Sequence, residues 1–210
     1  MPEFPVKIHF FAGLLLLLLA QASPGASPEE PGFDDSPLRE AISLPDWFKM
    51  SFLELQEDLA DARKNGKRGI IIYFGQKRCP YCKAQLENNW GQKDILNYTL
   101  RYFDVIAIDV RGQKPVVDLQ GREWTEKTWS VAQDTNFTPS LIFYDLQGRE
   151  ALRLRGYRPP YQFRAALEYV ADGHYHEESF RDYLARAEKA FSYGKDGLNE
   201  DEIFQPPPYL

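Results

Sequence analysis

The sequence has little cysteine, little histidine and no surplus of positive charge. Its 210 residues include two cysteines and three histidines, too few for the several disulfides of a small secreted scaffold or for a four-thiolate zinc site. The net charge is −6, whereas a nucleic-acid-binding protein is expected to carry a basic surplus. Long apolar runs are also lacking beyond the N-terminus, which excludes a protein with several membrane spans. No internal repeat is expected.

The one apolar run lies at the N-terminus, where it covers residues 10–20 and follows Lys7. This length falls short of the roughly 20 residues that a membrane-spanning helix needs. Ala20 and Ala22 supply the small-x-small pattern that precedes signal-peptidase cleavage. We therefore predict a cleavable signal peptide over residues 1–22, with an uncleaved membrane anchor as the alternative. Export places both cysteines in an oxidising compartment.

Composition divides the rest of the chain into a leader, a domain and a tail. Residues 23–45 are rich in Pro, Ser, Gly and Glu, which predicts a flexible leader. Residues 46–191 carry the apolar periodicity of a folded domain. Residues 192–210 are polar and acidic and end in Pro-Pro-Pro-Tyr-Leu, which predicts a flexible tail.

Helical periodicity begins at Trp47 and ends near Asn65-Gly66, a plausible helix end. Short β-branched runs predict buried strands at 69–75 and 103–110. A Gly-containing loop joins strands 140–145 and 151–155 as a hairpin. Further helices are expected at 80–89, 94–101, 125–134 and 177–191, and after Pro159 or Pro160.

The order of these elements predicts the α/β class. Strands joined through helices imply parallel pairing, and the hairpin adds an antiparallel edge. The expected architecture is a central mixed β-sheet flanked by helices, with helical extensions at the N-terminal and C-terminal ends.

Cys79 and Cys82 lie at the junction between the first strand and the next helix. Pro80 suits the first helical position, so Cys79 falls at the N-cap, where its sulfur faces free backbone N–H groups and the positive end of the helix dipole. Both features stabilise a thiolate, which makes Cys79 the expected nucleophile. Cys82 follows by nearly one turn, at a Cα–Cα distance of roughly 5 Å that suits a disulfide. Cys82 is therefore expected to attack a mixed disulfide on Cys79 and release the partner.

Three alternatives compete with this redox interpretation. No metal site is expected, because His9 lies in the predicted signal peptide and His174 and His176 lie far downstream of the cysteines. A purely structural disulfide across one helical turn would constrain the unfolded chain little. Two inert buried thiols do not suit an oxidising compartment. A CxxC pair between a strand and a helix favours redox chemistry.

The chain resembles thioredoxin-fold proteins over about residues 47–191. The resemblance rests on the strand 70–74, the motif Cys79-Pro80-Tyr81-Cys82, the strand ending at residue 109, and Thr138-Pro139 directly before the strand 140–144. It implies a thioredoxin-like fold with a cis peptide bond before Pro139. It also implies a substrate-binding surface formed by Pro80, Tyr81, Thr138 and Pro139 around the redox-active pair.

Three positions depart from the thioredoxin pattern. Pro80 and Tyr81 stand where thioredoxin has Gly-Pro and are the pair familiar from glutaredoxins, but the glycine-rich glutathione-binding stretch of glutaredoxins is not found. No cofactor is therefore expected. Tyr73 stands where thioredoxin has a buried Asp that serves in proton transfer.

The predicted export and the segments 154–160 and 180–184 are similar to the exported thioredoxin-related proteins of the SoxW type. This resemblance implies a periplasmic thiol-disulfide oxidoreductase with a soluble mature chain, which reduces disulfide-containing protein substrates. It also implies a membrane thiol-disulfide electron supplier as a partner. The alternative function is a non-enzymatic thioredoxin-fold protein that binds a partner or handles a metal.

Overall fold

The computed structural model describes residues 36–135 and 137–192. The predicted signal peptide, most of the leader and nearly all of the tail lie outside these ranges. Within the described ranges, no helix combines the length and the apolar character needed to cross a membrane.

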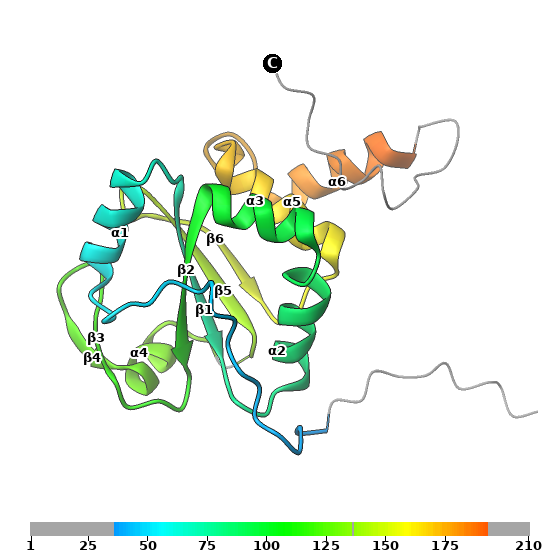
Figure 1. The fold of residues 1–210 in the computed structure, drawn as a ribbon. Coiled ribbons are helices and arrows are strands. Elements are labelled where there is room, and N and C mark those ends of the chain that lie inside the picture. Colours follow the sequence, from blue (N-terminus) through cyan, green and yellow to red (C-terminus); the bar gives the residue numbers. More distant parts are fainter. Residues whose placement is uncertain (1–35, 136, 193–210) are drawn as a thin grey trace, which may run out of the picture. The chain divides into compact units, whose positions relative to one another are not determined.

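A four-stranded mixed sheet lies at the centre of the domain (Figure 1). Its order is β2 (Phe103–Asp109), β1 (Gly69–Gly75), β5 (Ser140–Asp145) and β6 (Glu150–Arg155). β1 pairs in parallel with β2 and antiparallel with β5, which pairs antiparallel with β6. The predicted mixed sheet is confirmed. β1 is buried on both faces, as its uninterrupted apolar sequence indicates.

Helices cover both faces of this sheet (Figure 1). One face packs against α1 (Leu55–Lys64) and α4 (Glu126–Ala132). The other packs against α3 (Lys93–Tyr102) and α5 (Pro160–Ala171). The remaining helical elements are α2 (Pro80–Ala84), the π-helical η1 (Gln85–Asn89), the short η2 (His174–His176) and α6 (Phe180–Ser192). A small separate hairpin consists of β3 (Pro115–Val117) and β4 (Glu123–Thr125).

The helix predicted from Trp47 is wrong before Leu55, where α1 begins. Residues 49–53 instead follow the sheet edges. The Lys49 N–H donates to the Val105 carbonyl at 2.8 Å, and the Leu53 carbonyl accepts from the Val117 N–H at 2.9 Å. Leu53 has a φ of 64°, which a helix does not allow. The apolar spacing before Leu55 therefore comes from a loop.

The expectation of no internal repeat is also wrong. The six residues Asp-Leu-Gln-Gly-Arg-Glu occur twice, at 118–123 and 145–150. The first copy turns from β3 to β4 and the second from β5 to β6. In each copy one carboxylate oxygen of the Asp accepts from the backbone N–H groups two and four residues on, and the other accepts from the Arg Nε. The glycine of each copy has a left-handed φ, +76° and +75°, which suits this residue type.

Helix α1 contacts both copies at the equivalent residue. Gln56 donates to the carbonyl of Leu119 at 3.0 Å, and Arg63 donates to the carbonyl of Leu146. The second copy lies at the end of the sheet away from the cysteines, because the β1–β5 register pairs Gly69 with Asp145. The repeat therefore connects α1 to two hairpins, and its second copy lies away from the CxxC motif.

Candidate active site

Cys79 and Cys82 form a disulfide at the start of α2, directly after the loop that follows β1. Cys79 is the N-cap, and its sulfur accepts a hydrogen bond from the Cys82 N–H at 3.0 Å. Pro80 occupies the first helical position. The Cα–Cα distance is 5.1 Å, which confirms the separation predicted from the spacing. The helical turn thus holds the two sulfurs together and directs a backbone donor at the first.

The peptide bond between Thr138 and Pro139 is cis, as the family resemblance implied. Thr138 precedes β5, the strand beside β1, and this pairing brings it to the cysteines. Its hydroxyl and its carbonyl oxygen each lie 3.4 Å from the Cys79 sulfur. Gln76, in the loop before Cys79, donates to the Thr138 hydroxyl at 3.1 Å. This contact between two loops was missed from the sequence, where no pattern connects residues so far apart.

The two cysteines are both buried, and Cys79 is only 3% exposed. Pro80 is half-buried and Pro139 is buried. Tyr81 and Phe137 are exposed, Phe137 at 70%. Two exposed aromatic side chains therefore lie next to site residues in the sequence, Tyr81 beside Cys82 and Phe137 beside Thr138, whereas the disulfide itself is buried.

Tyr73 lies in the core behind the cysteines and is 2% exposed. Its ring contacts Phe48 and Trp90 at centroid distances of 5.6 and 5.9 Å. Burial raises the pKa of the phenol well above its usual value. Tyr73 therefore stays protonated at neutral pH and cannot accept a proton there.

Metal-ligating side chains do not gather in the described ranges. No group of three or more His, Cys, Asp or Glu side chains in residues 36–135 and 137–192 could hold a metal ion. His174 and His176 lie in η2, beyond α5 and away from the CxxC turn.

The fold and this site together define a thioredoxin-fold protein with a CxxC disulfide. Residues 55–171 match the family model of the thioredoxin-like domain. This match covers more than half of the chain, which therefore belongs to the thioredoxin-like family. No curated protein matches the sequence.

Several solved structures are similar to the chain. A thioredoxin-fold protein from Helicobacter pylori is 24% identical, with a TM-score of 0.47, over 60% of this chain and 82% of its own. A thioredoxin from Thermus thermophilus is 22% identical, with a TM-score of 0.45, over 60% of this chain and 94% of its own. The DsbD C-terminal domain from Neisseria meningitidis is 13% identical, with a TM-score of 0.41, over 55% of this chain and 93% of its own.

Proposed function

We propose that the protein is an exported thiol-disulfide oxidoreductase that reduces protein disulfides through Cys79 and Cys82. The observation that carries the proposal is the position of Cys79 at the helix N-cap, bonded to the Cys82 N–H and beside Thr138 and the cis Pro139. A donor aimed at the first sulfur stabilises negative charge there. Pro80, Tyr81, Thr138 and Pro139 surround the disulfide and are the proposed substrate-binding residues.

In the proposed cycle the reduced protein begins with two thiols. The Cys79 thiolate attacks one sulfur of the substrate disulfide, forms a mixed disulfide and releases the other sulfur as a thiolate. The Cys82 thiolate then attacks the Cys79 sulfur, which restores the Cys79–Cys82 disulfide and releases the second substrate thiolate. Two electrons pass to the substrate, whose two thiolates take up the protons that Cys79 and Cys82 lose.

The cycle needs a reductant, and we propose a membrane thiol-disulfide electron supplier. The proposal includes periplasmic export by a signal peptide over residues 1–22 and a SoxW-type relationship. It also includes a leader over 23–45 and a flexible tail over 192–210, on either side of a thioredoxin-like domain at 46–191. Part of that leader is ordered in residues 36–45, where the N–H groups of Leu38 and Ile42 donate to the carbonyls of Arg78 and Lys77.

The roles of the two cysteines are tested with Cys82→Ser and Cys79→Ser variants. A disulfide-bonded protein such as insulin is mixed with each reduced variant, and adducts are separated by non-reducing electrophoresis. Cys82→Ser is expected to accumulate a mixed disulfide, because the resolving sulfur is absent. Cys79→Ser is expected to form none, and an adduct in that variant would contradict the assigned nucleophile.

The direction of electron flow is tested by the reduction potential of the Cys79–Cys82 pair in dithiothreitol or glutathione buffers. A potential near about −250 mV or lower supports a reductase, since thioredoxin has about −270 mV. A potential near about −120 mV would instead indicate a disulfide donor. If no reversible couple is found, the enzyme proposal fails and the alternative of a binding or metal-handling protein replaces it.

A further inference from the structure

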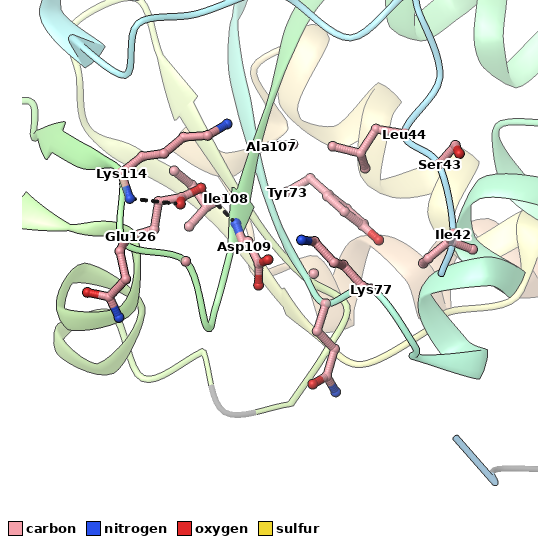
Figure 2. A pocket seen from close by; sticks show the side chains of 14 residues that line it. Ile42, Ser43, Leu44, Tyr73, Lys77, Ala107, Ile108, Asp109, Lys114 and Glu126 are labelled. Atoms are coloured by element: carbon pink, nitrogen blue, oxygen red, sulfur yellow. Dashed lines mark hydrogen bonds between the residues drawn. The ribbon is translucent and has the colours of Figure 1, made fainter. Parts of the chain in front are cut away.

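A cleft of about 820 Å³ opens beside the loop that carries the cysteines. Its size lies in the range of ligand-binding pockets, about 300–1,000 Å³. Ile42 and Leu44 line one wall, and Ala107 lines another (Figure 2). Gln76 also lines the cleft and donates to the hydroxyl of Thr138, which touches the Cys79 sulfur. Thr138 therefore connects Gln76, in the lining of the cleft, to the Cys79 sulfur.

The cleft exposes an unpaired stretch of sheet edge. β2 is an edge strand, and its odd-numbered residues direct their backbone groups outward. The Val105 carbonyl accepts from the Lys49 N–H at 2.8 Å, and the Asp109 N–H donates to the Glu126 carboxylate at 3.1 Å. Ala107 lies between them, so its N–H and C=O point the same way. Neither group has a hydrogen-bond partner within the described part of the chain.

Two ammonium groups and two carboxylates line the cleft, and the carboxylates are the groups already engaged by backbone N–H donors. Lys77 and Lys114 are exposed, and their ammonium groups extend toward the cleft from opposite sides (Figure 2). In the described ranges neither forms an ion pair. The opposing charges are Glu126 and Asp109. Both Glu126 oxygens accept backbone N–H groups, and one Asp109 oxygen accepts the Arg111 N–H.

Tyr73 adds an unused polar group to an otherwise apolar wall. Its side chain lines the cleft (Figure 2), and its buried hydroxyl has no hydrogen-bond partner among the described residues. Leaving such a group unpaired costs free energy, but the hydroxyl is buried, so the binding proposed below does not depend on it.

We propose that this cleft binds an extended, acidic segment of the protein substrate by strand addition to the free edge of β2. The segment pairs with the N–H and C=O of Ala107 and places acidic side chains near Lys77 and Lys114 and apolar ones against Leu44. Strand addition of this kind gives affinity through the main chain and specificity through alternate side chains. The inference names the substrate class of the redox site and so rests on the proposed function.

Binding is measured by fluorescence anisotropy with the oxidised protein and two labelled peptides without cysteine, Leu-Glu-Val-Glu-Leu and Leu-Lys-Val-Lys-Leu. The acidic peptide is expected to bind at least tenfold more tightly. Ala107→Pro should weaken it at least tenfold, because proline removes the outward N–H without removing a β1–β2 hydrogen bond. Because these peptides cannot exchange disulfides, this result is independent of whether Cys79 is active.

The charge requirement is tested with Lys77→Glu/Lys114→Glu, which is expected to abolish the preference for the acidic peptide. Lys64→Glu/Lys93→Glu changes the net charge equally at exposed positions outside the cleft and should leave the preference intact. If Ala107→Pro does not fold, this pair of double variants still tests whether the cleft binds the acidic peptide. Equal binding of the two peptides, or no binding of either at millimolar concentration, would overturn the proposal.

The link to the substrate is tested with disulfide-bridged peptides that carry either acidic or basic flanks. The reduced protein should reduce the acidic ones at least fivefold faster at low salt. If both are reduced equally fast, the redox function stands and the cleft is not its substrate site. If neither is reduced, the proposed function itself fails.

Discussion

Replacing the aspartate of either Asp-Leu-Gln-Gly-Arg-Glu copy should destabilise the domain strongly and by similar amounts. Asp118 and Asp145 are both buried. Each accepts two backbone N–H groups, an arginine Nε and one aromatic donor, from Trp124 at 2.8 Å or from Tyr175 at 3.3 Å. The chain therefore offers the same experiment twice, in two hairpins.

The magnitude follows from the groups that Asp→Ala would leave unpaired. The arginines of the two copies, Arg122 and Arg149, are exposed and can be rehydrated. The two backbone N–H groups lose their acceptor, and an unsatisfied buried donor costs about 1–3 kcal/mol. Because water partly reaches these loops, we take the lower part of that range and expect a loss of about 2–3 kcal/mol for each aspartate. Asp→Asn keeps one acceptor but presents an amide to the other donors, so about 1–2 kcal/mol is expected.

Urea unfolding followed by tryptophan fluorescence measures this loss. With a typical slope of about 2 kcal/mol/M, each Asp→Ala variant should lower the midpoint by roughly 1 M. Asp46→Ala, at an exposed position, is the control and should change stability by less than about 0.5 kcal/mol. A loss below 0.5 kcal/mol in Asp118→Ala and Asp145→Ala would refute the reasoning, since water would then replace the carboxylate at no cost. The folded fraction should keep the disulfide exchange proposed for Cys79 and Cys82.

Other outcomes follow from the same contacts. Tyr73→Phe should leave the free energy of unfolding unchanged or raise it by up to about 1 kcal/mol, because the lost hydroxyl has no partner in the described ranges. A marked drop in the thermal unfolding midpoint would contradict this, since it would mean that the hydroxyl makes a stabilising hydrogen bond. Thr138→Val removes the hydroxyl 3.4 Å from the Cys79 sulfur, and we expect the thiolate to lose about 1 kcal/mol of stabilisation. Iodoacetamide should therefore alkylate reduced Cys79 several-fold more slowly, and an unchanged rate would contradict this. Burial raises the pKa of Asp118 and Asp145, but hydrogen bonds outweigh burial and hold each pKa below its usual value. The two carboxylates therefore stabilise the fold fully at pH values above their pKa in the unfolded chain, about 3.9, and this stabilisation is lost as the pH falls through their pKa in the folded protein. Between pH 6 and 2, the urea midpoint should fall more steeply in the wild type than in the Asp118→Asn/Asp145→Asn variant.

Much of the fold could be predicted because its central strands are apolar on both faces. The strand predicted at 69–75 is confirmed as β1, and the strand predicted at 103–110 is confirmed to within one residue. Phe48 and Phe52 fit the helical spacing equally well, yet Phe48 is buried and Phe52 is 95% exposed. The spacing of apolar residues cannot separate these two side chains, because it does not show that the backbone before α1 follows the sheet edges instead of forming a helix. The hairpin of β3 and β4 was missed because three-residue strands have no detectable period.

The candidate site could be predicted only as far as it is local. The N-cap position of Cys79 and the distance to Cys82 depend on one helical turn, and the spacing fixes both. The contact of Gln76 with Thr138 and the free edge at Ala107 depend on tertiary structure, so no local pattern indicates them. The repeated hexapeptide is different, because its two copies are identical in the sequence and a direct comparison would have found it.

The burial of Cys79 bears on rates as well as on equilibrium. A disulfide whose first cysteine is 3% exposed can be favoured to react thermodynamically and yet react slowly with small thiols, since exchange requires access to a sulfur. A protein partner that displaces the surrounding loops when it binds gains access to the sulfur, whereas a freely diffusing small molecule gains this access rarely. Burial of the CxxC pair would therefore favour exchange with protein partners over exchange with small thiols.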